Sequence, residues 1–227
     1  MDTQQQALLG VLGGIGPSAT VDFLSKLTRL TPATCDQDHL PWITVSQPGI
    51  DAKGPFLIEA VAWLANQGTK LIAIPCNTSH LWYAQMQAAS SAPILHIADA
   101  VIEELQLSKA PMGAMAILAS RSTVQAGIYS ERLVANGFDL VVITEKEQTV
   151  VDQIIKDVKG GQVGTARDSM RALLQMLAER GAKTAILGCT ELPIAFLVQA
   201  DDSHSGMWVM DSSMALARVS LRRLGYV

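Results

Sequence analysis

The stretch Gly68–Thr78, GTKLIAIPCNT, decides the fold because its pattern occurs again at Gly181–Glu191, GAKTAILGCTE. In both copies a lysine precedes a short apolar, partly β-branched run, and a cysteine follows that run. Such a run, bounded by glycine and turn-forming residues, is typical of a buried strand in a parallel sheet. Cys76 and Cys189 are therefore predicted to lie at the carboxyl ends of two strands, where open α/β sheets bind their ligands.

The rest of the chain alternates between predicted strands and helices. Besides the two cysteine stretches, with strands at 71–75 and 184–188, strands are predicted at 8–15, 42–46, 94–97, 112–119, 140–144 and 207–210. Helices are predicted at 19–30, 56–67, 81–89, 98–107, 149–158, 165–180 and from about Ser212. This alternation predicts an α/β fold with helices on both faces of parallel sheets.

The repeated order of these elements predicts two pseudo-symmetric lobes, with the active site in the cleft between them. We expect an N-terminal α/β lobe of residues 1–105 plus about 211–227, and a C-terminal α/β lobe of residues 106–210. Only if the carboxyl edges of the two sheets face each other can both cysteines reach one substrate.

The composition restricts the class of function. Only 17% of the 227 residues are charged and the net charge is −4, which argues against a nucleic-acid binder. The N-terminus lacks the basic region of a signal peptide, and no apolar run is long enough for a membrane span. Three cysteines do not suggest a disulfide framework, so we expect a cytoplasmic protein without a membrane partner.

Two thiols, one from each lobe, suggest two-base proton transfer at one carbon. One thiolate removes a proton from one face, and the other thiol delivers a proton to the opposite face. A loop before a helix N-terminus is expected to lower the pKa of each cysteine. This chemistry inverts a stereocentre without a cofactor, so we expect none. Donors at strand ends or helix starts would stabilise the carbanion-like charge; the candidates are Asn77, Thr78, Ser120, Ser122, Thr123 and Thr190.

Other interpretations of the cysteines stay open. A buried cysteine at a strand end more often packs than reacts, but equivalent positions in a repeat, each followed by polar residues, favour catalysis. A redox pair is the least favoured interpretation, because two lobes would hold the thiols a substrate's width apart. Cys35 has no counterpart in the repeat and is interpreted as structural or incidental.

A second motif, GIGPSA at Gly14–Ala19, matches the G-x-G-x-x-A pattern of dinucleotide-binding proteins. Asp36 follows about twenty residues later, but in a polar loop rather than at the end of a strand, and Pro17 is unusual in that pattern. We therefore expect the glycines, Gly14 included, to let the backbone approach a carboxylate substrate.

The histidines give a weaker signal. His80 follows Cys76 by four residues and either tunes the thiol or caps and packs, with the second interpretation favoured. His39 and His204 lie in polar loops. The spacing of Asp201, Asp202 and His204 supports no specific metal site, so no metal is expected.

Several motifs together resemble the aspartate/glutamate racemase family. LGGIGPSAT, DQDH at 36–39, PCNTSH, PILHIADA, the segment at 120–133 and LGCTELP occur in the family's order through about residues 8–225. The resemblance implies a cofactor-independent racemase of two lobes, usually a homodimer, acting on an acidic amino acid. It implies catalysis by Cys76 and Cys189, and substrate binding by Gly14, Asn77, Thr78, Ser120, Thr123, Thr190 and Glu191.

The chain departs from the family pattern where specificity is set. Aspartate racemases usually carry a P-D-R-T segment whose arginine grips the side-chain carboxylate, whereas Ile50-Asp51-Ala52-Lys53 stands here. Lys53 is the candidate substitute, although it lacks the bidentate fork of arginine. Lys159 matches a family lysine near the substrate, or is a solvated helix-end residue. Arg121 is either an alternative anion grip or a surface residue.

Racemisation is therefore a firmer prediction than aspartate as the substrate. The alternatives are a related isomerase or decarboxylase on the same scaffold, acting on maleate, hydantoins or arylmalonates, and a catalytically idle protein that binds a small carboxylate. The retained CNT and GCTE motifs favour the racemase.

Overall fold

The computed structural model describes residues 7–47, 54–108, 110–111, 113–196 and 206–227, which divide into two compact units. Met1–Ala100 and Ser213–Val227 form the first unit, and Val101–Ser212 forms the second. The chain passes from the first unit to the second within helix α4 (Ile97–Leu107) and returns at the start of α10 (Ser212–Arg223).

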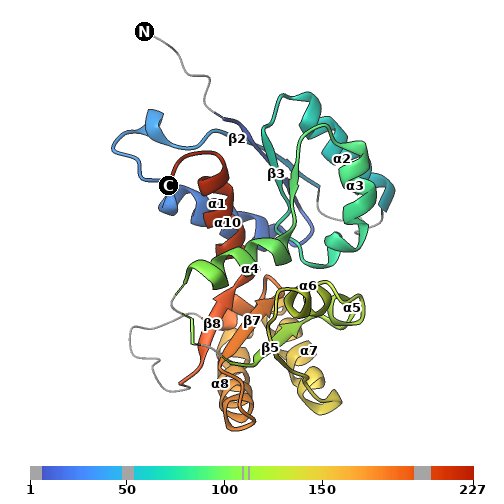
Figure 1. The fold of residues 1–227 in the computed structure, drawn as a ribbon, viewed down its shortest axis with the longest axis vertical. Coiled ribbons are helices and arrows are strands. Elements are labelled where there is room, and N and C mark those ends of the chain that lie inside the picture. Colours follow the sequence, from blue (N-terminus) through green and yellow to red (C-terminus); the bar gives the residue numbers. More distant parts are fainter. Residues whose placement is uncertain (1–6, 48–53, 109, 112, 197–205) are drawn as a thin grey trace. The chain divides into compact units, whose positions relative to one another are not determined.

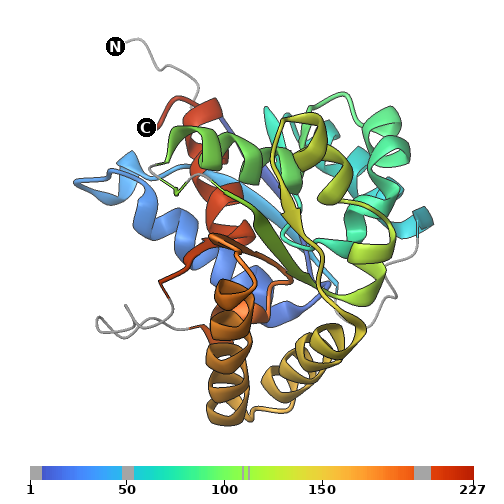
Figure 2. The same ribbon diagram turned by 60° about the horizontal axis from the view of Figure 1, so that its bottom comes forward.

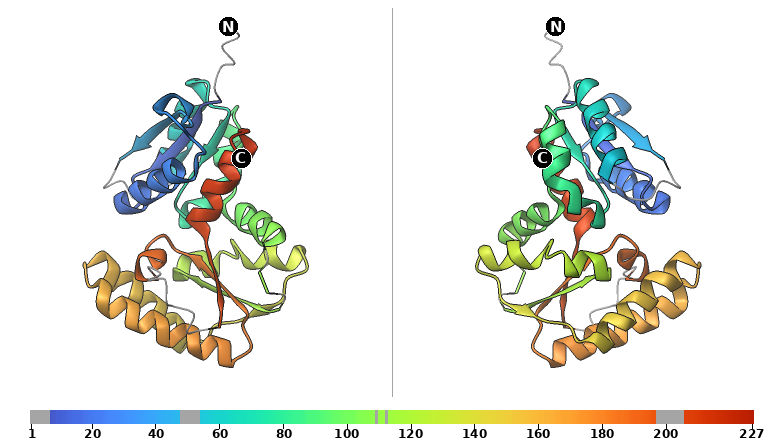
Figure 3. Two further views of the ribbon diagram at one scale, coloured as in Figure 1. Left: turned by 90° about the vertical axis from the view of Figure 1, so that its left-hand side faces the viewer. Right: turned by 90° about the vertical axis from the view of Figure 1, so that its right-hand side faces the viewer.

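The first unit is built on a parallel sheet whose described strands run in the order β2-β1-β3-β4. These strands are β1 (Leu9–Gly13), β2 (Trp42–Ser46), β3 (Leu71–Ala73) and β4 (Ile94–Leu95). The two 3-10 helices are η1 (Asp36–Asp38) and η2 (Thr78–Trp82). Helix α1 (Pro17–Leu30) lies on one side of the sheet, and α2 (Gly54–Asn66) and α3 (Tyr83–Ala89) lie on the other (Figures 1 and 3). Right-handed crossovers between these strands require that arrangement.

Helix faces in the first unit follow the apolar spacing of the sequence. Leu57 and Leu64 of α2 are fully buried against Ile72 of β3. Helix α1 begins at Pro17, two residues before the predicted start, since proline fits the first turn without losing a hydrogen bond. Val21 is 67% exposed, and the buried face of α1 is centred on Phe23.

The second unit repeats the first. Its described strands run in the order β6-β5-β7-β8, all parallel. They are β5 (Met115–Ala119), β6 (Leu140–Val141), β7 (Thr184–Gly188) and β8 (Trp208–Asp211). The helices between them are α5 (Arg121–Gln125), α6 (Ser130–Ala135), α7 (Glu145–Lys159), α8 (Val163–Glu179) and α9 (Leu192–Ala195). Helices α7 and α8 lie side by side (Figure 2), and their apolar faces pack with α9 on the sheet.

The predicted fold class, α/β with two similar lobes on parallel sheets, is confirmed. Several predicted ends were wrong because local hydrogen bonds set them. Strand β3 stops at Ala73 rather than at residue 75, since Pro75 cannot donate to a ladder. Helix α7 begins four residues earlier than predicted, because Thr144 caps it. Within the described residues, none of the helices combines the length and apolar character that crossing a membrane requires.

Candidate active site

Cys76 lies in the first unit, on the loop that follows β3. Its backbone N–H donates to the carbonyl of Ile74 over 2.8 Å, which closes a γ-turn centred on Pro75. The fixed φ of proline suits the central position of such a turn. The thiol is half-buried and packs at the margin of the apolar core. The turn thus leads the chain out of the sheet and places Cys76 beyond its carboxyl edge.

His80 contacts the backbone of Cys76. The Nδ1 atom of His80 lies 2.9 Å from the carbonyl oxygen of Cys76, and the backbone N–H of Ile97 donates to Nε2 over 3.1 Å. His80 is therefore packed between the segments that follow β3 and β4.

The polar residues after Cys76 form the start of η2. Asn77 is buried, with only 4% of its surface exposed, and Thr78 is half-buried beside it. Both residues make interactions within the protein. Asn77 and Thr78 thus lie next to Cys76 at the start of η2.

Cys189 occupies the corresponding place in the second unit, directly after β7. The preceding Gly188 has no room for a side chain, since an added Cβ would lie 3.0 Å from the ring of Tyr129 and 3.1 Å from Cβ of Ala119. Tyr129 is fully buried, and burial raises its pKa. The packing of β7 against Tyr129 therefore fixes the end of the strand and the position of Cys189 directly after it.

The thiol of Cys189 donates a hydrogen bond to Oε2 of Glu191 over 3.0 Å. Lys159, the last residue of α7, lies 3.5 Å from Oε1 of the same carboxylate, and Thr190 contacts Oε2 over 3.4 Å. The structure therefore brings Thr190, Glu191 and Lys159 to Cys189.

This environment favours the protonated thiol. Burial raises the pKa of Cys189 well above its usual range, and the charge and hydrogen bond of Glu191 raise it further. The backbone N–H of Glu191 and the charge of Lys159 lower the pKa of Cys189, but by less than burial and the Glu191 carboxylate raise it. The expectation of a lowered pKa was wrong for this cysteine, because α9 has only four residues and a carboxylate lies against the sulfur.

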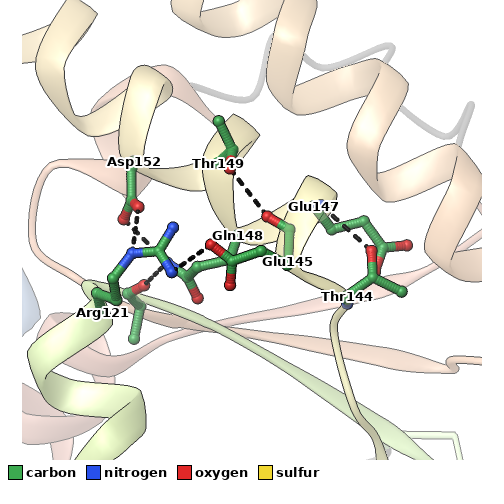
Figure 4. Close-up of polar contacts among 8 residues, drawn as sticks. Arg121, Thr144, Glu145, Glu147, Gln148, Thr149 and Asp152 are labelled. Atoms are coloured by element: carbon green, nitrogen blue, oxygen red, sulfur yellow. Dashed lines mark hydrogen bonds and ion pairs between the residues drawn. The ribbon is translucent and has the colours of Figure 1, made fainter.

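Ser120 and Thr123 lie together after β5, with their hydroxyl oxygens 3.0 Å apart. Neighbouring Arg121 does not point to an anion-binding role. Its guanidinium binds Glu145 over 2.6 Å and Asp152 over 3.1 Å (Figure 4), and these hydrogen bonds and charges raise its pKa. Arg121 therefore ties α5 to α7, which favours the surface interpretation.

Gly14 is required by the protein's own backbone. Its φ is +85°, and an added Cβ would lie 2.3 Å from the backbone nitrogen of Gln47. Its N–H donates to the hydroxyl of Thr20 over 2.9 Å. The β1–α1 turn thus lies close to the segment after β2 at this glycine, and the predicted approach to a carboxylate substrate stays a prediction.

Some candidates cannot be placed. Lys53 and the acidic cluster with Asp201, Asp202 and His204 lie outside the described residues. Cys35 is exposed and directly precedes η1. Within the described part of the chain, no group of three or more His, Cys, Asp and Glu side chains is arranged to hold a metal ion.

Comparison with known protein families agrees with this geometry. The model of the Asp/Glu/Hydantoin racemase family matches residues 12–219, which is most of the chain and includes both cysteine loops. The chain belongs to this family. The predicted resemblance is therefore confirmed.

Individual relatives in this racemase family match most of the chain. The chain is 30% identical to a broad specificity amino-acid racemase, RacX, of Bacillus subtilis, over 93% of this chain and 95% of that protein. It is 26% identical to a glutamate racemase of Methylococcus capsulatus, over 83% of this chain and 68% of the relative. An aspartate racemase of Picrophilus torridus has a similar structure, with a TM-score of 0.81, 25% identity and coverage of 96% and 94%.

Sequence reasoning missed two features of this racemase-family site. The tie between His80 and Ile97 joins residues that are far apart in the sequence, so no local pattern indicates it. The packing of Tyr129 on Gly188 had a signal, because glycine stands before Cys189 where proline stands before Cys76.

Proposed function

We propose that the protein is a pyridoxal-independent amino-acid racemase that inverts Cα of aspartate or glutamate by two-base proton transfer between Cys76 and Cys189. The observation that carries this proposal is the equivalence of the two cysteines. Each follows the third strand of a parallel sheet, and the two sheets have the same strand order. Membership of the racemase family and the names of the relatives support the reaction class.

The different surroundings of the thiols assign their first roles. Cys189 starts as the acid, since its S–H donates to Glu191. Cys76 then acts as the thiolate base and takes the α-proton of the substrate, and the Cys189 thiol gives its proton to the opposite face. After one inversion Cys76 carries the proton and Cys189 is the thiolate. The reverse reaction, or proton exchange with water, restores the starting state.

The remaining polar residues would bind the substrate's ends. Asn77, Thr78 and Thr190 stand beside the cysteines, and Ser120 and Thr123 present paired hydroxyls at the end of β5. Hydroxyl and amide donors of this kind stabilise charge that develops on the α-carboxylate. Glu191 binds the thiol of Cys189 and Lys159 pairs with Glu191. Lys53 is proposed as a contact to the substrate's side chain.

A broader substrate range is a second candidate. Arg121, the arginine considered as an alternative grip for a side-chain carboxylate, is engaged by Glu145 and Asp152. The relative with the name broad specificity amino-acid racemase points in the same direction. The substrate test therefore includes neutral and basic amino acids.

Formation of the opposite enantiomer, measured by chiral chromatography, tests the proposal. Purified protein is incubated with L-aspartate, L-glutamate and a panel of other amino acids, without added cofactor. We expect racemisation of an acidic amino acid, reduced by about 100-fold or more in Cys76→Ser and Cys189→Ser, because general acid–base groups contribute about that much. The matched control is Cys35→Ser, at an exposed cysteine outside the site.

Absence of racemisation across the whole panel would contradict the proposal and favour a non-amino-acid substrate or a binding role. Full activity in either active-site variant would contradict the two-thiol mechanism. We also propose a homodimer on the family resemblance, which light scattering would detect as twice the chain mass of 24.3 kDa.

A further inference from the structure

We propose that His80 is a positioning residue that holds Cys76 through a hydrogen bond from its Nδ1–H to the Cys76 carbonyl. The catalytic consequence rests on the proposed racemase function, whereas the effect on the position of the thiol does not. The proposal starts from the two hydrogen bonds of the imidazole, which reach the ends of two neighbouring strands.

The contacts of His80 define its tautomer. The backbone N–H of Ile97 can only donate, so Nε2 of His80 must be the acceptor without a proton. The carbonyl oxygen of Cys76 can only accept, so Nδ1 must carry the proton. His80 is therefore the neutral Nδ1–H form. A second proton on Nε2 would face the Ile97 N–H and break that bond.

The ring is held on several sides. Only 4% of the surface of His80 is exposed. The ring of His96 contacts it edge-on with centroids 4.7 Å apart, and Tyr83 lies beside both rings. The hydroxyl of Tyr83 donates to the carbonyl of Ile94 in β4 over 3.2 Å, which fixes α3 to the sheet. His80 thus links the β4–α4 junction to the loop that carries Cys76, so that the two segments hold each other in place.

His80 completes the hold on the cysteine's backbone. The N–H of Cys76 is already bound to Ile74, so the bond from His80 leaves neither backbone group of Cys76 free to reorient. The histidine therefore restricts where the thiol starts through the backbone of the residue that carries it.

The second copy of the motif lacks this device. Pro193 stands at the position equivalent to His80, and the carbonyl of Cys189 accepts from the N–H of Leu192 instead. There the thiol itself is bound, by Glu191. The two halves thus restrain equivalent cysteines in different ways, one through the backbone and one through the sulfur.

The test replaces His80 by phenylalanine, which keeps an aromatic ring beside His96 and Tyr83 but removes both hydrogen bonds. His80→Asn is the rescue variant, because its side-chain N–H lies near the place of Nδ1. His39→Phe, at a partly exposed histidine on another loop, is the matched control. Alkylation of Cys76 and of Cys189 is followed separately by peptide mass spectrometry, and kcat and KM are measured on the substrate found for the wild type.

We expect His80→Phe to make Cys76 react severalfold faster with iodoacetamide, because the released loop exposes the thiol, while Cys189 reacts as in the wild type. We expect kcat to fall by about 10- to 100-fold with little change in KM, as misplacement of a catalytic group by about 1 Å does. His80→Asn should recover most of both values. A merely structural role would lower stability without this split between the two thiols.

Unchanged alkylation of Cys76 and unchanged kcat in His80→Phe would overturn the proposal. So would an asparagine variant that behaves no better than the phenylalanine variant. If His80→Phe does not fold, the comparison of His80→Asn with His80→Gln decides, because glutamine places its amide near Nε2 and cannot replace the Nδ1 donor. Failure of the racemase function would leave the alkylation result standing on its own.

Discussion

Glu191 gives Cys189 an environment that Cys76 does not share. Thr78 stands at the position equivalent to Glu191 in the first copy of the motif. A carboxylate that accepts a hydrogen bond from a thiol stabilises the protonated form, and burial of the sulfur acts in the same direction. The nearby Lys159 limits this effect but is itself 63% exposed, so water screens its charge. The pKa of Cys189 is therefore raised in part by a carboxylate that the first copy of the motif lacks.

Glu191→Gln is predicted to lower the pKa of Cys189, because it removes the charge that opposes the thiolate. The wild-type thiol has a raised pKa, so its alkylation should become fast only at strongly alkaline pH. In the variant the rate should rise at a lower pH, with Cys189 still above the ordinary range because it stays buried. Peptide-resolved alkylation rates between neutral and alkaline pH measure this shift.

Glu179→Gln serves as the matched control, at an exposed glutamate near the end of α8. It should leave the pH profile of Cys189 unchanged. A Glu191→Gln profile that coincides with the wild type, or moves to higher pH, would show that this carboxylate does not set the state of the thiol.

At the scale of the element, the turn between β1 and α1 leads to a second prediction, which concerns stability. Gly14 and Gly68 have similar positive φ values, +85° and +81°, but only Gly14 has backbone atoms within reach of an added Cβ. Gly68→Ala should therefore cost about 1–2 kcal/mol for the left-handed conformation. Gly14→Ala should cost about 1–3 kcal/mol more, for the overlap with Gln47. Urea denaturation of both variants gives the difference, and equal losses would contradict the clash.

The capping interactions at the N-terminus of α7 lead to a third prediction, also on stability. Thr144 and Glu147 bond reciprocally as a capping box, and Arg180 of the α8 C-terminus binds both carboxylate oxygens of Glu147 over 2.7 and 2.6 Å. Figure 4 shows the pairing of Thr144 with Glu147. Burial alone would raise the pKa of Glu147, but the bonds from Thr144 and Arg180 outweigh it and lower the pKa. Glu147→Gln should reduce the free energy of unfolding by about 1–3 kcal/mol at pH 7.

The pH dependence of that loss of stability follows from the lowered pKa of Glu147. A carboxyl with a lowered folded-state pKa stabilises the fold fully above its unfolded-state pKa of about 4.3, and the contribution disappears as the pH falls through the folded-state value. The difference between wild type and Glu147→Gln should therefore shrink in urea denaturation below about pH 4. Glu145→Gln, whose side chain is 76% exposed, should cost less than about 1 kcal/mol. A constant difference at all pH values would contradict this assignment.

The sequence predicted the existence of the elements better than their ends. Apolar runs and helical spacing depend on burial, which acts over many residues, and each predicted strand is found in the described chain. Ends depend on single hydrogen bonds. The γ-turn at Pro75 shortened β3, and the cap at Thr144 lengthened α7. Such contacts depend on side-chain placement that an apolar pattern does not encode.

At the scale of the whole molecule, the repeat was the most informative signal. It predicted two similar lobes on parallel sheets, each with a cysteine at the carboxyl end of a strand, and the structure has two such units. The hydrogen bonds of His80 with Ile97 and of the Cys189 thiol with Glu191 could not be predicted, because they depend on ring and rotamer placement. The substrate class came from the family resemblance rather than from the residues themselves.

The central claim is that each thiol handles one proton, and the deuterium content of both enantiomers early in a reaction in D2O tests it most directly. NMR of the α-proton is combined with chiral mass spectrometry, with L-aspartate and then L-glutamate as substrate. The account predicts that the D-enantiomer carries deuterium at Cα while unreacted substrate keeps its proton, and that Cys76→Ser and Cys189→Ser form no product at this rate. Equal labelling of both enantiomers from the start, or a product that retains the substrate's own proton, would indicate a single base and contradict the account.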